Sequence, residues 1–300
     1  MIPMESRFLS LSSVALLALL PCASLLAAPN EPRTPDSAVT PIERSRHTDF
    51  LREIKAAHGN FDFVLIGDSI TDWWQKRNGP DTYARFAPWK PLDLGVAAET
   101  TEEVLWRLLN GELDGIHPKV IMLMIGTNNI ARGDQPEWVA AGVKKILETI
   151  RSKQPQAKIL LLAIFPRSAS SQDAIRRRVD ETNKLLPALA DGQNIFYMDI
   201  GPRFLDAQGN LSKEIMPDLL HPNAKGYQIW LDAVSPKLEE LMGSPLGPES
   251  SSSVTPLPAK TPSKQPPDHA FTKYSPNGPS WPCCPSPFRV PTQVDRTSGD

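Results

Sequence analysis

The 300-residue chain has only three cysteines, and none of them lies in the part that has the pattern of a folded domain. Cys22 belongs to an apolar N-terminal stretch, whereas Cys283 and Cys284 stand together near the C-terminus. Adjacent cysteines do not have the spacing of a zinc site, and the domain contains no pair that could form a disulfide. The sequence therefore predicts a fold without disulfides or a cysteine-bound metal, and we expect no metal or cofactor at its site.

The chain also lacks a strong net charge, with 32 basic and 34 acidic residues and a formal charge of −2. A nucleic-acid groove requires a clustered basic face, so we expect no nucleic-acid partner. One short basic run, Arg176–Arg178, falls in a helical pattern. We expect it to be a solvated helix face, and phosphate binding is the alternative.

Residues 1–28 have the pattern of an export signal. Arg7 supplies the positive charge, and Leu9–Leu20 is an apolar stretch too short to span a bilayer comfortably. Ala27-Ala28 offers a cleavage site, which predicts an exported protein, periplasmic or extracellular, without a stable membrane span. Lipid anchoring at Cys22 is an alternative, although a proline immediately before the cysteine argues against it. An uncut N-terminal anchor is a further alternative.

The composition divides the remaining chain into three parts. Residues 29–45 are rich in proline and charge and are predicted to be a linker. Residues 46–243 carry the apolar periodicity of one domain. Residues 244–300 contain thirteen of the 31 prolines and a serine tract, which predicts a disordered tail.

Within the domain, short apolar runs alternate with amphipathic helical patterns. This alternation predicts βαβ units, a mainly parallel sheet and helices on both faces of that sheet. The apolar runs are Phe61–Gly67, Pro91–Val96, Lys119–Gly126, Ala157–Phe165 and Asn194–Ile200. The helical patterns are His47–His58, Thr101–Leu113, Glu137–Lys153, Ser171–Leu189 and Asn223–Met242.

The first apolar run ends abruptly at Gly67-Asp68-Ser69. Ligands of open α/β sheets bind at the carboxyl ends of the strands, so Ser69 is placed where a nucleophile could act. Serine is also a preferred helix cap, and Ser69 could instead cap a helix that starts near Thr71.

A serine nucleophile needs a base, a group that orients the base, and donors for the oxyanion. Of the five histidines, only His221 follows the last predicted strand and opens the last helix. Asp218 precedes it by three residues, a spacing that can bring a carboxylate to Nδ1 and leave Nε2 for the serine proton. The alternative is that Asp218 caps a turn and His221 is a polar loop residue.

Candidate oxyanion donors follow the third and second strands. Asn128, in Gly126-Thr127-Asn128-Asn129, carries a neutral amide that donates two hydrogens. The loop Leu94–Thr101 can supply a backbone N–H. The alternatives are an Asx-turn at Asn128 and a helix cap at Thr100 or Thr101.

Together these blocks resemble the SGNH or GDSL-type serine hydrolases. Gly67–Ile70 is similar to the first block of that family, Gly95–Thr101 to the second, Gly126–Asn129 to the third and Asp218-x-x-His221 to the last. The stretch from Leu94 to Leu108 is most similar to the branch of platelet-activating-factor acetylhydrolase catalytic subunits. The likeness covers about residues 47–242.

The resemblance implies a flavodoxin-like three-layer α/β/α sandwich with a five-stranded parallel sheet and no required metal. It implies that Ser69 is the nucleophile, His221 the general base and Asp218 the residue that orients His221. The backbone N–H of Ser69 and the amide of Asn128 would then be oxyanion donors. The family usually has glycine as the third donor, where this chain has Ala98, which keeps the N–H but fits poorly if the backbone needs a positive φ.

We expect a serine esterase that hydrolyses short-chain acyl, above all acetyl, esters, with carbohydrate-borne esters as candidate substrates. The alternatives are a lipase or thioesterase for longer chains and a non-catalytic surface-binding module. Trp73 and Trp74 stand near the predicted rim, where aromatic rings could line a substrate cleft or belong to the core. The sequence does not predict the oligomeric state.

Overall fold

A computed structural model describes residues 34–41 and 44–248 of the chain. A five-stranded sheet in the order β2-β1-β3-β4-β5 forms its centre, and all four strand pairings are parallel. The prediction of a parallel sheet is therefore confirmed, and each strand lies inside a predicted apolar run. The strands are β1 (Phe63–Gly67), β2 (Pro91–Gly95), β3 (Val120–Met124), β4 (Lys158–Leu162) and β5 (Ile195–Met198).

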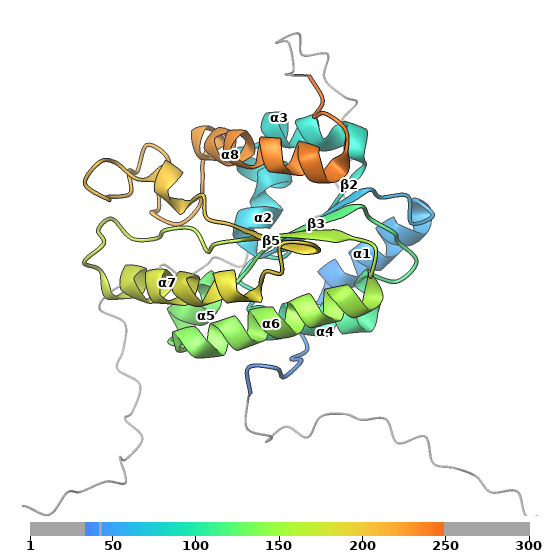
Figure 1. The fold of residues 1–300 in the computed structure, drawn as a ribbon, viewed down its shortest axis with the longest axis horizontal. Coiled ribbons are helices and arrows are strands. Elements are labelled where there is room, and N and C mark those ends of the chain that lie inside the picture. The colour runs from blue at the N-terminus through green and yellow to red at the C-terminus, as the bar shows by residue number, and fades with distance from the viewer. Residues whose placement is uncertain (1–33, 42–43, 249–300) are drawn as a thin grey trace, which may run out of the picture. The chain divides into compact units, whose positions relative to one another are not determined.

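Helices cover both faces of the sheet, which makes the domain a three-layer α/β/α sandwich (Figure 1). α1, α4, α5, α6 and α7 lie on one face, and α2, α3 and α8 lie on the other. The α-helices are α1 (Arg44–Ala56), α2 (Ser69–Trp73), α3 (Pro80–Tyr83), α4 (Thr101–Arg107), α5 (Thr127–Arg132), α6 (Pro136–Lys153), α7 (Ala174–Leu185) and α8 (Ala224–Met242). Short 3₁₀ and π segments are η1 (Trp74–Asn78), η2 (Ala84–Trp89), η3 (Leu108–Glu112), η4 (Leu186–Leu189) and η5 (Gly201–Phe204).

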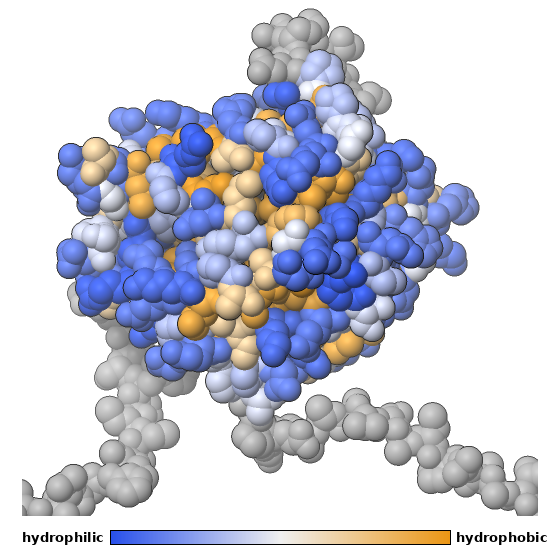
Figure 2. Space-filling model, viewed as in Figure 1, coloured by the Kyte–Doolittle hydropathy of each residue, from blue (hydrophilic) through white to orange (hydrophobic). Residues whose placement is uncertain are grey.

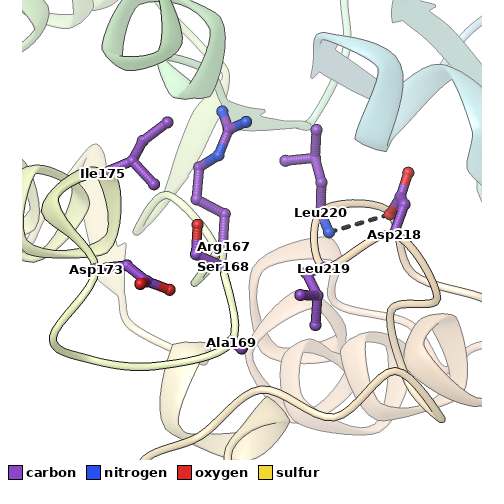
Figure 3. Close-up of a pocket in the computed structure, with 8 residues that line it drawn as sticks. All are labelled: Arg167, Ser168, Ala169, Asp173, Ile175, Asp218, Leu219 and Leu220. Atoms are coloured by element: carbon purple, nitrogen blue, oxygen red, sulfur yellow. Dashed lines mark hydrogen bonds between the residues drawn. The ribbon is translucent and has the colours of Figure 1, made fainter. Parts of the chain in front are cut away.

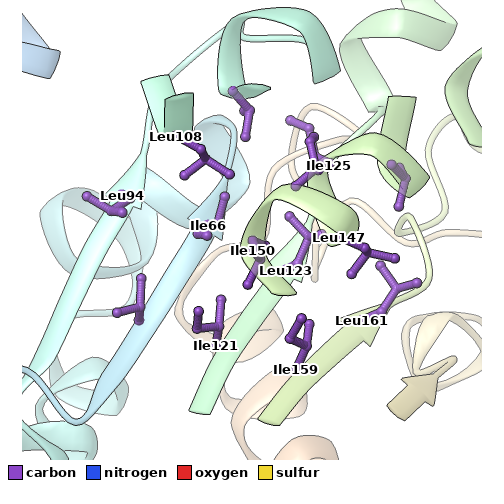
Figure 4. Packing of buried hydrophobic residues seen from close by; sticks show 14 of the residues in the cluster. Ile66, Leu94, Leu108, Ile121, Leu123, Ile125, Leu147, Ile150, Ile159 and Leu161 are labelled. Atoms are coloured by element: carbon purple, nitrogen blue, oxygen red, sulfur yellow. The ribbon is translucent and has the colours of Figure 1, made fainter. Parts of the chain in front are cut away.

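Alternate residues of each central strand enter two separate cores. In β1, Val64 and Ile66 pack beneath α1, α4 and α6, whereas Phe63 and Leu65 pack beneath α3 and α8. Figure 4 shows the first of these cores, with side chains of the strands interleaved with those of the helices. Burial on both faces explains why the strands are continuous apolar runs in the sequence.

Two predicted helices are shorter in the structure. The pattern Thr101–Leu113 becomes α4 followed by the π segment η3, inside which Asn110 and Gly111 (φ of +111°) leave the helical conformation. The pattern Ser171–Leu189 starts later, at Ala174, and its last turn tightens to the 3₁₀ segment η4, which contains Pro187.

The prediction that Arg176–Arg178 is a solvated face is wrong for Arg176. Its side chain is only 1 % exposed, in line with Val179 and Thr182 on the buried side of α7. Arg178 donates a hydrogen bond to the carbonyl of Ile130. The run therefore winds from the interior to the surface within one turn instead of lying on one face.

The ordered domain extends beyond the predicted boundaries 46 and 243. In the predicted linker, Val39 N–H donates to the carbonyl of Glu102, and α1 already begins at Arg44. After α8, Gly247 and Arg85 exchange two hydrogen bonds, and Ser244 accepts one from Trp89. The predicted signal peptide (1–28), Cys22 and nearly all of the predicted tail (249–300) lie outside the described residues.

The edge strand β5 lies toward the viewer in Figure 1, and its four residues are only partly buried. In the same view, Figure 2 shows apolar colour reaching the surface across the middle of this face. Between residues 34 and 248, outside the gap at 42–43, no helix is long and apolar enough to cross a membrane.

Candidate active site

Ser69 lies directly after β1 and is the first residue of α2. The helix is capped by Asp68, whose side chain accepts a hydrogen bond from Ile70 N–H at 3.0 Å, so the interpretation of Ser69 as the cap is wrong. Gly67 is required for this tight turn, because a Cβ there would lie 2.6 Å from the carbonyl oxygen of Met124. The geometry leaves the Ser69 hydroxyl available at the carboxyl end of the sheet.

The structure brings Ser69 and His221 together from positions 152 residues apart. Ser69 Oγ lies 2.9 Å from His221 Nε2, and His221 Nδ1 lies 2.5 Å from Asp218 Oδ2. A hydroxyl, an imidazole and a carboxylate are thus linked in the order that nucleophilic catalysis requires.

Asp218 is held in place by its own turn. Its Oδ1 accepts hydrogen bonds from the backbone N–H groups of Leu220 (3.0 Å) and His221 (2.8 Å), which leaves Oδ2 for the imidazole. Leu219, between them, has a φ of +60°, an unfavourable conformation for leucine that closes the turn. Burial raises the pKa of the Asp218 carboxyl, but the hydrogen bonds from His221 outweigh it and the net pKa is lowered. The carboxyl is therefore ionised, as an orienting group must be.

Trp73 stacks on the imidazole of His221, with ring centroids 4.0 Å apart and planes inclined by 29°. The guanidinium of Arg77 lies 4.4 Å from the centroid of the Trp73 ring. The predicted cleft residue Trp73 is thus next to the site, where it supports the base. For Trp74 the prediction of a cleft residue is wrong and the core alternative is confirmed, because its side chain is fully buried and donates to Thr82 Oγ1.

Glu99 connects the two other predicted oxyanion donors, Asn128 and Ala98. Asn128 Nδ2 donates to the carbonyl of Glu99 at 2.8 Å, and Ala98 is the residue before Glu99 in the chain. The amide of Asn128 has a second hydrogen, which this bond does not use. Asn128 is half-buried, and Ala98 is exposed at the rim. The backbone N–H of Ser69 is the third group of this set, at the start of α2.

Ala98 has a φ of +66°. Glu99 N–H donates to the carbonyl of Val96, so Ala98 is the third residue of a turn in which a left-handed residue is needed and glycine is preferred. The chain therefore keeps this turn with an alanine, at a cost of about 1–2 kcal/mol in backbone strain.

Two residues that the sequence analysis did not single out hold the rim together. Asn129 is fully buried; its Oδ1 accepts from Thr101 N–H and its Nδ2 donates to Thr101 Oγ1, both at 3.0 Å. Arg167, in the loop after β4, donates to the carbonyl and the hydroxyl of Thr127 at 3.0 Å. The Gly126–Asn129 block could have suggested Asn129, but no local signal distinguishes Arg167.

Asp68 is almost fully buried beside Ser69. Burial raises the pKa of its carboxyl to about 7, and its hydrogen bond from Ile70 N–H and the charge of Arg167 only partly oppose this. Within residues 34–41 and 44–248, no three histidine, cysteine, aspartate or glutamate side chains are grouped so that they could hold a metal ion. That the reaction needs no cofactor stays a prediction.

A pocket of about 480 Å³ adjoins the turn that carries Asp218. Figure 3 shows the Arg167–Ala169 segment on one side of this pocket and the Asp218–Leu220 turn on the other. Ser168 N–H donates to the carbonyl of Leu219 at 3.0 Å, which ties the two sides together. The lining combines charged and hydroxyl groups with the apolar side chains of Leu219, Leu220 and Ile175.

A five-stranded parallel sandwich with a linked serine, histidine and aspartate at the carboxyl ends of its strands defines a serine-hydrolase type of site. Residues 65–229 match the model of the GDSL-like lipase/acylhydrolase family. Because this match covers more than half of the chain, the protein belongs to that family, and it is an ester hydrolase.

Similar proteins agree with this assignment. Platelet-activating factor acetylhydrolase IB subunit alpha2 of Rattus norvegicus is 36 % identical over 187 residues, which cover 61 % of this chain and 77 % of the relative. The human subunit alpha1 is 31 % identical over 208 residues, 64 % of this chain and 84 % of the relative. The crystal structure of a GDSL-like lipase from Bacteroides thetaiotaomicron has the same fold, with a TM-score of 0.57 and 18 % identity over 66 % of this chain and 99 % of that one.

Proposed function

We propose that this protein is a serine esterase that removes short acyl groups, above all acetyl, from small ester substrates through an acyl-enzyme intermediate. The observation that carries the proposal is the continuous link Ser69 Oγ–His221–Asp218, with distances of 2.9 and 2.5 Å. Ser69 and His221 lie 152 residues apart in the sequence, so the tertiary structure brings them together.

In the proposed mechanism Ser69 Oγ attacks the ester carbonyl while His221 Nε2 takes the hydroxyl proton. The amide of Asn128 and the backbone N–H groups of Ala98 and Ser69 stabilise the oxyanion. His221 then protonates the departing alcohol, and a water molecule, activated in the same way, releases the acyl group. Asp218 keeps Nδ1 protonated and orients the imidazole throughout.

The acetyl preference is supported by the relatives, whose names describe acetylhydrolases. The alcohol part of the substrate is proposed to be hydroxylated, as in an acetylated carbohydrate. The pocket beside the Asp218 turn offers donors in Arg167 and Ser168 and acceptors in Asp173 and Asp218, and hydroxyl groups can pair with both. The N-terminal pattern supports export of the enzyme to the periplasm or the medium.

The assignment of Ser69 is tested with the Ser69→Ala variant and p-nitrophenyl acetate. We expect turnover to fall by about 10⁴-fold or more and labelling by a fluorophosphonate probe to disappear. Ser171→Ala, an exposed serine in the loop before α7, is the matched control and should keep both properties. Wild-type turnover by Ser69→Ala would refute the proposed nucleophile.

A lipase or thioesterase acting on longer acyl chains is the second candidate. The apolar side chains of Leu219, Leu220 and Ile175 in the same pocket favour it, because they could cover an alkyl chain. A series of p-nitrophenyl esters separates the two candidates. Higher kcat/KM for the C2 ester than for the C8 ester supports the acetylesterase, and the reverse order supports the second candidate.

A further inference from the structure

A buried arginine lies behind the loop that carries Ala98. Arg107, in the last turn of α4, is 0 % exposed. Its Nη2 donates to the carbonyl of Leu94 at 2.9 Å, and its Nε donates to the carboxylate of Glu99 at 2.7 Å. One guanidinium therefore holds both ends of the loop 94–99.

The Glu99 end of this loop bears directly on two of the proposed oxyanion donors. The Ala98 N–H lies one residue before Glu99, and the carbonyl of Glu99 accepts the hydrogen bond from Asn128 Nδ2 at 2.8 Å. The position of Glu99 thus sets the backbone of one donor and the side chain of another. Neither Arg107 nor the Glu99 carboxylate has to touch the substrate for this.

The loop also contains a strained residue, Ala98, whose backbone conformation must be fixed by its surroundings. Ala98 has a φ of +66°, which costs about 1–2 kcal/mol for a residue with a Cβ. Such a conformation persists only where the surroundings fix it, and here the residues on either side of the turn are bonded to the same planar group. A guanidinium suits this task because its donors have a fixed geometry.

We infer that Arg107 and Glu99 are positioning residues that clamp the loop 94–99 in the strained form in which Ala98 N–H and Asn128 can act together on the oxyanion. The inference rests on the proposed function. It assigns to this pair an effect on the transition state that a purely structural ion pair would not have.

The same guanidinium provides an internal control. Arg107 Nη1 also bonds to Glu112, which is fully buried and belongs to η3, and the Glu112 carboxylate forms a second hydrogen bond with His47 Nδ1 in α1. The hydrogen bonds of the Glu112 carboxylate go to Arg107 and His47 and not to the loop 94–99. Glu99→Gln and Glu112→Gln therefore remove one charge each from the same partner, but only the first change alters an acceptor that belongs to the loop 94–99.

The test compares Glu99→Gln and Glu112→Gln at pH 8, where the carboxyl of Glu99, whose pKa burial raises to about 7, is ionised in the wild type. Glutamine has the shape of glutamate, and folding is checked by circular dichroism and thermal melts. We expect Glu99→Gln to lower kcat for p-nitrophenyl acetate about tenfold or more with little change in KM, and Glu112→Gln to lower only the melting temperature. The fall in kcat should not exceed the factor of about 10²–10³ that the loss of a whole oxyanion donor causes.

Ala98→Gly sharpens the test, because glycine has no tendency to leave a positive φ. In the Ala98→Gly background, we expect Glu99→Gln to lower kcat by a smaller factor than in the wild type. Equal losses of kcat in both backgrounds, or equal losses in Glu99→Gln and Glu112→Gln, would overturn the inference.

A measurement without substrate keeps the inference distinct from the proposed function. In ¹⁵N–¹H spectra, Glu99→Gln should shift the signals of Ala98 N–H and the Asn128 side-chain amide, and Glu112→Gln should leave them in place. Unshifted signals in Glu99→Gln refute the clamp even if the enzyme is active. A wild type without esterase activity refutes the proposed function, and the spectra still decide whether the clamp sets the loop.

Discussion

The two sides of the site are built in opposite ways. On the acid–base side, Asp218 has a side chain that is 53 % exposed, and its partners Leu220 and His221 belong to the same turn. On the oxyanion side, Asn128 and Ala98 are connected through Glu99 to the fully buried Arg107.

The difference reflects what each side has to do. The imidazole must move a proton and change charge, and a short turn with solvent nearby tolerates that change. The oxyanion donors gain most from being fixed before charge develops, and fixed donors require tertiary contacts that do not relax. Four predictions test this contrast.

The largest effect is expected from the base itself. His221→Ala should lower kcat for p-nitrophenyl acetate by about 10⁴-fold or more, because no other described group contacts Ser69 Oγ as a base. Asp218→Asn should cost less than the roughly 10⁴-fold seen for a buried orienting aspartate, because water reaches the exposed carboxylate. Equal losses of kcat in the two variants would contradict the view that water partly replaces Asp218 as the hydrogen-bond partner of His221.

On the oxyanion side, Asn128→Ala should lower kcat by about 10²–10³ with KM little changed, because the amide acts mainly in the transition state. Asn110→Ala is a matched control, since the amide of Asn110 is exposed and donates only to the carbonyl of Trp106. A rise in KM at constant kcat would show that Asn128 binds the substrate instead.

A third prediction concerns stability beneath the oxyanion loop. Asp93 is buried in β2, accepts from Gly95 N–H and has a pKa raised by burial to about 7 from 3.8. The folded state therefore holds this proton more tightly, and the carboxyl destabilises the fold increasingly as the pH rises from about 4 to 7. Asp93→Asn should stabilise the protein by roughly 2–4 kcal/mol at pH 8 and by less at pH 5.

Thermal or urea unfolding at both pH values measures this gain. The exposed Asp218 has a lowered pKa, so its effect on the pH dependence of stability is opposite to that of Asp93. Its ionised carboxylate stabilises the fold, and this contribution is lost as the pH falls through its folded pKa. A gain from Asp93→Asn that is the same at pH 5 and pH 8 would mean that the carboxyl is not the cause.

The smallest effect is expected at Ala98. Ala98→Gly removes a strain of about 1–2 kcal/mol but adds chain entropy to the unfolded state, so we expect a net gain of about 0.5–1 kcal/mol. Ala97→Gly, in the same turn but without a positive φ, should lose a similar amount. Urea unfolding measures both, and a loss in Ala98→Gly as large as in Ala97→Gly would show that the turn is not strained.

Much of this molecule follows from local pattern. The five apolar runs predicted the five strands, because strands buried on both faces must be apolar throughout. Asp218 and His221 could be paired from their spacing, because the turn that joins them is local. Gly67 and Ser69 could be placed at the end of a strand for the same reason.

Other features were decided by contacts between distant segments. Trp74 and Arg176 are buried although neighbours of similar character are not, because burial depends on which side of the helix meets the sheet. The clamp at Arg107 joins β2, α4 and η3, and Arg167 reaches Thr127 from another strand end. The sequence pattern does not indicate that Arg107 is buried, nor which carboxylates bond to it.

The sequence by itself thus predicted the strands, the family and the residues of the proposed triad, because each strand and each family block is a short stretch with its own local pattern. Only the tertiary structure decided that Ser69 Oγ lies 2.9 Å from His221 Nε2, that Ala98 has a φ of +66°, and that one buried guanidinium holds both ends of its loop. These depend on how the sheet and its helices pack, and packing joins residues that no local pattern connects.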